Sequence, residues 1–230
     1  MMSKNTKVII EISDLVHSYR GKIETVALNG VNLSVKKGER LVIRGKSGVG
    51  KTTLLHCIAG ILRPTQGRIL VDSHDILLYN ENQLADYRCK TVGLIYQSYN
   101  LAQFLTVKEN IEFPMVLAKI PVEKREKRIA ELTEFLEIKR YLEQKPEFLS
   151  GGEQQRVAIA IALANNPPIV LADEPTGNID IETAKTVYMH LSHMCQIYNT
   201  TLVMASHDLN SAQYADREVI LSELESKLKK

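Results

Sequence analysis

The sequence predicts a single α/β domain built around a mostly parallel β-sheet. Three observations lead to this prediction. Short apolar runs typical of buried strands recur along the chain, segments with helical periodicity separate them, and a glycine-rich loop joins one apolar run to a helix. A chain of 230 residues is long enough to bury a full core, and α/β folds of this size commonly form one domain.

The composition is that of an ordinary globular protein, with 44% hydrophobic and 24% charged residues. A net charge of +2 is too small to predict a nucleic-acid-binding surface. The cysteines Cys57, Cys89 and Cys195 are far apart, so they predict neither a disulfide framework nor a zinc site, and they fit a reducing cytosol. The longest apolar stretch, residues 157–164, is far below the ~18 residues of a membrane span. We therefore expect that any membrane span comes from another chain.

The first part of the chain alternates strands with one helix. Its apolar runs and turn signals predict strands at residues 8–12, 31–35, 41–43 and 69–71, and a helix at residues 52–59. The order of strand, loop, helix and strand from residue 41 to residue 71 is a βαβ pattern.

A helical region interrupts this alternation. Residues 106–116 and 122–136 are predicted helices, the second with an apolar stripe along one face. We interpret residues 97–144 as a helical insertion. The alternation then resumes with a strand at 169–172, a helix at 181–198 and a strand at 201–205, which predicts a parallel sheet.

Residues 45–52 match the phosphate-loop pattern G-x-x-x-x-G-K-[ST] and lie between an apolar strand and a helix, as the motif requires. Glycines let backbone N–H groups turn toward phosphate oxygens, and the helix start adds a favourable dipole. Lys51 is expected to reach the β- and γ-phosphates, and the Thr52 hydroxyl to ligate Mg²⁺. The alternative is a glycine-rich turn with a solvated lysine. The predicted ATP-binding residues here are Gly45, Lys46, Ser47, Gly48, Val49, Gly50, Lys51, Thr52 and Thr53.

Two carboxylates follow the apolar run 169–172. We expect Asp173 to assist Mg²⁺ through a water molecule, and Glu174 to polarise the attacking water, a general-base role typically worth ~10²- to 10⁴-fold in rate. The alternative is a solvated strand end. The phosphate loop upstream favours the catalytic interpretation.

Ser150 and Glu153 form an S-x-x-E capping box at the start of an apolar helix. A capping box does not require Gly151 and Gly152, since glycine lowers helix stability. Exposed backbone N–H groups at a helix start can bind an anion. The sequence therefore predicts two phosphate-binding surfaces.

With residues 45–52, 149–156, 173–174 and 206–207 in this order, the sequence resembles the nucleotide-binding subunits of ABC transporters over nearly its whole length. The resemblance implies a P-loop NTPase fold with an N-terminal antiparallel β subdomain, a core of approximately 1–96 and 166–230, and a helical subdomain of approximately 97–165. It also implies a homodimer with ATP and Mg²⁺. Each copy places Ser150, Gly151, Gly152 and Glu153 against the γ-phosphate of the ATP held by the other.

The same resemblance implies roles for four further residues. Tyr19 stacks on adenine, and Asp180 links the two active sites. Gln97 touches Mg²⁺ and senses the membrane partner, while His207 contacts the γ-phosphate. Taken without the resemblance, Tyr19 is simply a tyrosine at a strand end, and Gln97 is unremarkable.

Residues 101–114 and 173–180 are similar to those of the lipoprotein-release and macrolide-export group. The cell-division ATPase of the same group shares these features. This implies an ATPase in the cytoplasm, held at the inner face of the cell membrane by a separate permease. The alternative is a mechanical or regulatory switch without solute transport. Lys46 departs from the usual proline or small residue. His190 and His193, three apart on a helix, are interpreted as a solvated helix face and not as a metal site.

Overall fold

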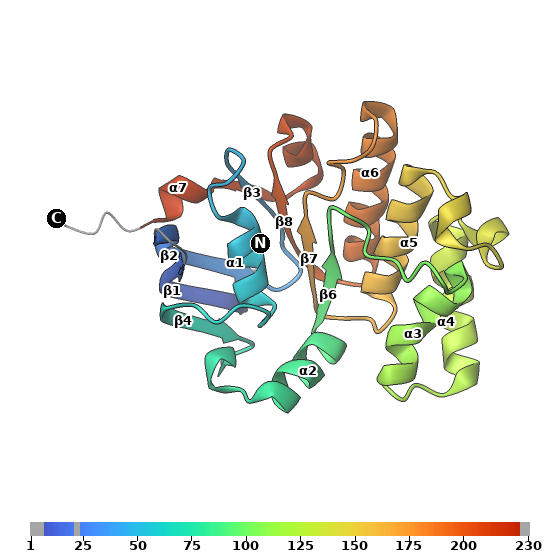
Figure 1. The fold of residues 1–230 in the computed structure, drawn as a ribbon, viewed down its shortest axis with the longest axis horizontal. Helices are drawn as coiled ribbons and strands as arrows, with labels where there is room; N and C mark the ends of the chain where they lie inside the picture. The colour runs from blue at the N-terminus through green and yellow to red at the C-terminus, as the bar shows by residue number, and fades with distance from the viewer. Residues whose placement is uncertain (1–6, 21–23, 226–230) are drawn as a thin grey trace, which may run out of the picture.

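Two β-sheets of different kind form the framework of the computed structural model, which describes residues 7–20 and 24–225 (Figure 1). One sheet is antiparallel with strand order β2-β1-β4-β5, and the other is parallel with strand order β6-β7-β8-β3-β9. The predicted antiparallel N-terminal part and the predicted parallel core sheet are both confirmed.

The described strands are β1 (Val8–Tyr19), β2 (Thr25–Lys36), β3 (Arg40–Arg44), β4 (Gln66–Val71), β5 (His74–Asp75), β6 (Val92–Ile95), β7 (Ile169–Asp173), β8 (Thr201–Ser206) and β9 (Arg217–Ile220). The described α-helices are α1 (Lys51–Ile58), α2 (Glu81–Lys90), α3 (Val107–Leu117), α4 (Val122–Phe135), α5 (Gly151–Leu163), α6 (Ile181–Ile197) and α7 (Leu221–Leu224). Short 3₁₀ turns lie at Ile76–Leu78, Lys139–Tyr141, Pro146–Phe148 and Leu209–Tyr214.

The parallel sheet separates two hydrophobic cores. Along β7, Ile169 and Leu171 join the core that also contains α1 and the antiparallel sheet. Val170 and Ala172 join the core formed with helices α3 to α6. This alternation follows from the strand geometry, in which successive side chains point to opposite faces. Because both faces are covered, β7 is apolar throughout until it reaches Asp173.

Strand β4 corrects the βαβ interpretation. It does not join β3 in the parallel sheet but pairs antiparallel with β1. Gly67 allows this approach, because it has φ of +95° and a Cβ there would lie 2.6 Å from Leu15 Cα in β1. The order of elements along the chain was predicted correctly, whereas the sheet to which β4 belongs was not.

Helices α3, α4 and α5 lie on the side of the molecule opposite the antiparallel sheet (Figure 1). Residues 97–144 contain α3, α4 and a 3₁₀ turn but no strand, as predicted, and the structure describes all of them. The exact division into 1–96 with 166–230 and 97–165 stays a prediction. None of the helices in the described part of the chain combines the length and the apolar character needed to cross a bilayer.

Candidate nucleotide-binding site

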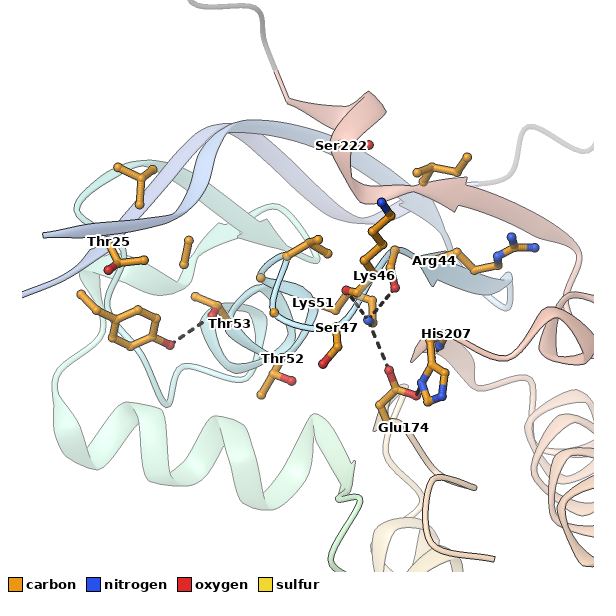
Figure 2. A pocket seen from close by; sticks show the side chains of 18 of the residues that line it. Thr25, Arg44, Lys46, Ser47, Lys51, Thr52, Thr53, Glu174, His207 and Ser222 are labelled. Atoms are coloured by element: carbon orange, nitrogen blue, oxygen red, sulfur yellow. Dashed lines mark hydrogen bonds and ion pairs between the residues drawn. The ribbon is translucent and has the colours of Figure 1, made fainter. Parts of the chain in front are cut away.

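A cavity of about 1140 Å³ opens beyond the carboxyl end of β3 (Figure 2). Every residue of the predicted phosphate loop, 45–52, lines it, as does the predicted ATP-binding residue Thr53. Tyr19 from β1 and three residues that follow other parallel strands, Gln97, Glu174 and His207, also line it. The fold therefore gathers the loop and the three predicted catalytic residues at one edge of the sheet, where open α/β sheets bind their ligands.

Gly48 and Gly50 allow the backbone of the loop to turn, each for a different reason. Gly50 has φ of +102°, and a Cβ there would lie 2.1 Å from the Ala27 carbonyl oxygen, so β2 leaves no room for a side chain. Gly48 has φ of +79° but no atom within 4 Å of such a Cβ, so its requirement is conformational. Both explain why this turn needs glycine at these positions.

Lys51 is buried at the first position of α1, with 6% of its surface exposed. Its Nζ donates to the carbonyl oxygens of Gly45 at 2.8 Å and Lys46 at 3.1 Å, and it lies 3.3 Å from Glu174 Oε1. The ammonium group thus closes the loop upon itself and connects it to the end of β7. The Lys46 side chain instead points away from Glu174, toward the segment that carries Ser222 (Figure 2).

Thr52 and Asp173 meet beside the loop. Thr52 Oγ1 donates to Asp173 Oδ1 at 3.1 Å. Burial raises the pKa of Asp173, although the hydrogen bond from Thr52 acts in the opposite direction. A hydroxyl and a carboxylate at one point are the oxygen ligands that Mg²⁺ prefers when phosphates and water complete its shell. Within the described residues no cluster of three or more His, Cys, Asp or Glu side chains offers a protein-only metal cage.

Glu174 lies between Lys51 and His207 (Figure 2). The His207 Nδ1–H group donates to Glu174 Oε2 at 2.7 Å, and the His207 backbone N–H donates to the same oxygen at 3.3 Å. The Glu174 backbone has φ of +46°, a left-handed conformation that is uncommon outside glycine, and its N–H donates to the Ala205 carbonyl at 3.0 Å. Such strained residues concentrate at functional sites.

Tyr19 stands at the edge of the cavity with 45% of its surface exposed. Its hydroxyl lies 3.0 Å from Thr53 Oγ1, which connects the end of β1 to the first turn of α1. The exposed ring is therefore available to a base, and the predicted stacking on adenine stays a prediction. Gln97 packs closely against the segment after β7. A Cβ added to Gly177 in that segment would lie only 2.7 Å from Gln97 Nε2.

Ser150, Gly151, Gly152 and Glu153 do not line the cavity. They form the start of α5, and both halves of the predicted capping box are present. The glycines also have a packing reason that the sequence did not reveal. A Cβ on Gly152 would lie 2.3 Å from Thr183 Cγ2 in α6, and one on Gly151 would lie 2.8 Å from the Tyr99 hydroxyl. Close packing therefore requires glycine at both positions, whether or not the helix start binds an anion.

Asp180 also lies outside the cavity walls. Its carboxylate caps α6 by accepting hydrogen bonds from the backbone N–H groups of Glu182 at 3.1 Å and Thr183 at 3.0 Å. Hydrogen bonding within this cap, chiefly from Thr183, lowers the pKa of Asp180. Its predicted role in linking two active sites stays a prediction.

The interpretation of His190 as part of a solvated face was wrong. His190 is 7% exposed, with its ring 5.7 Å from that of Phe135 in α4, and burial lowers its pKa. The ring of His193 also packs against Phe135, at 5.3 Å. His190 therefore belongs to the contact between α6 and α4, whereas His193 is exposed, as predicted.

Several residues that line the cavity were not predicted from the sequence. Thr25, Val26 and Ala27 from β2 and Ile220 and Ser222 near the end of the chain line the cavity. None belongs to a recognisable motif. Only the pairing of β2 with β1 and of β9 with β3 brings them to the loop.

Comparison with known proteins gives a consistent result. Residues 28–177 match the family described as ABC transporter. The chain is 41% identical over 204 residues to an uncharacterized ABC transporter ATP-binding protein of Thermotoga maritima, covering 88% of this chain and 87% of the relative. It is 40% identical over 217 residues to the lipoprotein-releasing system ATP-binding protein LolD of Legionella pneumophila, covering 94% and 96%.

Among solved structures, the chain is similar to the ATP-binding cassette MJ0796 of Methanocaldococcus jannaschii, in a dimeric, post-hydrolysis state bound to ADP and Pi. The two share 35% identity with a TM-score of 0.87, and the match covers 96% of this chain and 98% of the other. A second structure, cbiO1 from Clostridium perfringens, matches with a TM-score of 0.82 at 30% identity over 93% of this chain and 84% of that one.

Proposed function

Because the chain belongs to the ABC transporter family and is an ATP-hydrolysing, nucleotide-binding subunit of it, we propose that two copies close around two ATP molecules and drive a separate membrane permease. The observation that carries this proposal is the cavity at the end of β3. It brings Lys51, Glu174 and His207 together but has no wall from the capped start of α5.

Within one copy, Lys51 and His207 are the groups that meet the triphosphate. Both contact the Glu174 carboxylate. Phosphate oxygens in the loop compete with that carboxylate for the same donors. Nucleotide binding therefore weakens the contacts of Lys51 and His207 with Glu174. Glu174 then accepts a proton from the attacking water as a general base. Thr52 and Asp173 would hold Mg²⁺, which when bound neutralises charge on the phosphates.

The second copy supplies the remaining contacts in this proposal. The backbone N–H groups of Gly151 and Gly152, with the Ser150 hydroxyl, approach the γ-phosphate held by the other copy's loop. The dimeric state of MJ0796 supports this arrangement, since that protein shares this fold over nearly its whole length. Hydrolysis removes the γ-phosphate from between the two chains, and the dimer reopens.

The likeness to LolD supports a permease of the lipoprotein-release or macrolide-export type. In this proposal the chain stays in the cytoplasm and is held at the inner face of the membrane by that permease. Gln97 lines the cavity and begins the helical region, and this position supports its proposed role in sensing the permease.

Co-purification tests the permease directly. The affinity-tagged chain is isolated from detergent-solubilised membranes of its own cells, and the proteins that accompany it are identified by mass spectrometry. The expected partner is a permease with a few membrane spans and a large extracytoplasmic domain. Recovery of the chain with no integral-membrane protein, while it hydrolyses ATP, would contradict the transport role and leave the ATPase intact.

A further inference from the structure

Tyr188 lies in the middle of α6, behind the residues assigned to catalysis. It is 1% exposed and does not line the nucleotide cavity. It lines a second, smaller cavity of about 300 Å³ whose walls also include Glu174 and His207. The Glu174 and His207 pair therefore has the nucleotide loop on one side and Tyr188 on the other.

The Tyr188 hydroxyl connects the two segments that carry this pair. Thr176 Oγ1 donates to the Tyr188 hydroxyl at 2.7 Å, and Ser206 Oγ lies 3.3 Å from the same oxygen. Because Thr176 is the donor in the first contact, the tyrosine proton is free to be donated to Ser206. Thr176 follows Glu174 by two residues, and Ser206 immediately precedes His207. One hydroxyl thus bridges the loop after β7 and the last residue of β8.

The hydroxyl occupies a fixed position. The ring of Tyr188 is stacked on that of Tyr214, with centroids 5.4 Å apart and planes at 25°. Burial raises the pKa of Tyr188, so the phenol keeps its proton and remains a donor. On the far side of the bridge, Ser206 Oγ accepts a hydrogen bond from the Asp208 backbone N–H at 3.0 Å. The chain of contacts is anchored at both ends.

The strained backbone of Glu174 needs this kind of support. A left-handed residue persists only where its surroundings over-determine its conformation. The hydrogen bond from the Glu174 N–H to the Ala205 carbonyl holds one point of the loop, and the Thr176 contact with Tyr188 holds a second. If the second point is released, the loop can turn and carry the carboxylate away from His207.

We propose that Tyr188 is a positioning residue that fixes the distance between Glu174 and His207 through its hydroxyl. This rests on the proposed roles of those two residues in ATP hydrolysis. Displacements of about 1 Å in a catalytic group can lower the rate on the order of 100-fold. Lys51 and loop 45–53 make no contact with the bridge, so nucleotide binding does not depend on it.

The test is Tyr188→Phe, which keeps the stacked ring and removes only the hydroxyl. The expected result is a fall of about 10- to 100-fold in kcat with the KM for ATP and the calorimetric ATP affinity unchanged within about twofold. The matched control is Tyr87→Phe. Tyr87 is another buried tyrosine, and its hydroxyl donates to the Ile58 carbonyl at 2.8 Å, away from the pair. This control loses a comparable hydrogen bond and keeps the kcat of the wild type.

A second measurement separates positioning from general loss of stability. In a Glu174→Gln background, adding Tyr188→Phe is expected to lower the single-turnover rate no further, because the carboxylate that Tyr188 positions is already gone. Equal kcat for Tyr188→Phe and Tyr87→Phe, or equal losses with and without the Glu174 carboxylate, would overturn the proposal. If Tyr188→Phe does not fold, Thr176→Val removes the same contact from the loop side, with the same expectation. A wild-type chain without ATPase activity would refute the proposed function and this inference with it.

Discussion

Helices α1 and α5 begin after a small residue, Gly50 and Ser150 respectively, but only α5 is capped by side chains. At α1 no side chain caps the helix and no acidic residue stands in the first turn, while Lys51 reaches back over the loop. At α5 the Ser150 side chain accepts from the Glu153 N–H, and the Glu153 carboxylate accepts from the Ser150 N–H. An uncapped start leaves its N–H groups and dipole for an anion, whereas a capped start has already used part of both.

In the proposed mechanism, the start of α1 therefore binds the phosphates first, as an anion site that one chain completes. The start of α5 keeps only Gly151 and Gly152, which the capping box does not use, and a carboxylate stands beside them. It therefore suits a weaker, second contact with a phosphate already held elsewhere.

Glu174→Gln should have the largest effect. It removes the general base while keeping the size of the side chain, so kcat falls by ~10²- to 10⁴-fold. Nucleotide affinity is retained, because the loop itself is unchanged. Phosphate release is the measurement, and the control is Glu182→Gln in the first turn of α6, where the carboxylate pairs with Lys185 at 2.7 Å. A kcat within tenfold of wild type would remove Glu174 from this role.

Lys51→Ala should have the next largest effect, on binding. Loss of a charged hydrogen bond of about 1.5–3 kcal/mol corresponds to a fall in ATP affinity of about 10- to 150-fold. Lys46→Ala is the matched control in the same loop, because its side chain points away from Glu174 (Figure 2). Titration calorimetry that finds equal affinities for the two variants would show that α1 does not bind phosphate through Lys51.

Gly152→Ala tests the start of α5. The added Cβ would lie 2.3 Å from Thr183 Cγ2, so we expect the free energy of unfolding to fall by about 1–3 kcal/mol. Adding Thr183→Ser removes that methyl group and should restore stability in urea titrations. If the phosphate held by the other copy also approaches this backbone, the added Cβ obstructs it, and ATPase activity stays low in the double variant. Full recovery of activity together with stability would mean that Gly152 serves packing alone.

Asp216→Asn should have the smallest effect. Asp216 belongs to neither helix start, so this substitution leaves both of them intact. A hydrogen bond from Arg40 lowers the pKa of Asp216, so the ionised carboxylate stabilises the fold above the pKa of the unfolded chain. This contribution is lost as the pH falls through the folded pKa. Since the Asp216 side chain is 45% exposed, the loss on substitution is below about 1 kcal/mol at neutral pH and vanishes in acid. An undiminished difference in acid would contradict this assignment.

The sequence predicted the local features well. The phosphate loop, the capping box at Ser150 and the apolar strand before Asp173 all depend on neighbouring residues, and the structure contains each of them. Helix α2 was missed because it buries only Leu84 and Tyr87 and so lacks a clear apolar stripe. Its Asn80 and Gln83 form a capping box that could have revealed it.

What the sequence could not predict depends on contacts between distant segments. The sheet membership of β4 is set by the close approach of β1 to Gly67. The packing role of Gly152 depends on where α6 places Thr183, and the burial of His190 depends on Phe135 in α4. Strand β9 has two charged residues followed by two apolar ones, without the alternation that predicts a half-buried strand, so no pattern in the sequence indicated it.

One measurement tests most directly whether a second copy completes the site. Light scattering is recorded in Mg²⁺ and ATP for Glu174→Gln carrying either Ser150→Asp or Ser150→Asn. Asp and Asn both cap helices as well as Ser does, so α5 is kept in each, but only Asp places a negative charge against the γ-phosphate. We predict twice the mass of the 25.9 kDa chain for Glu174→Gln alone and with Ser150→Asn, and a monomer with Ser150→Asp. Equal dimerisation of both double variants, or a Glu174→Gln protein that stays monomeric in ATP, would contradict the account.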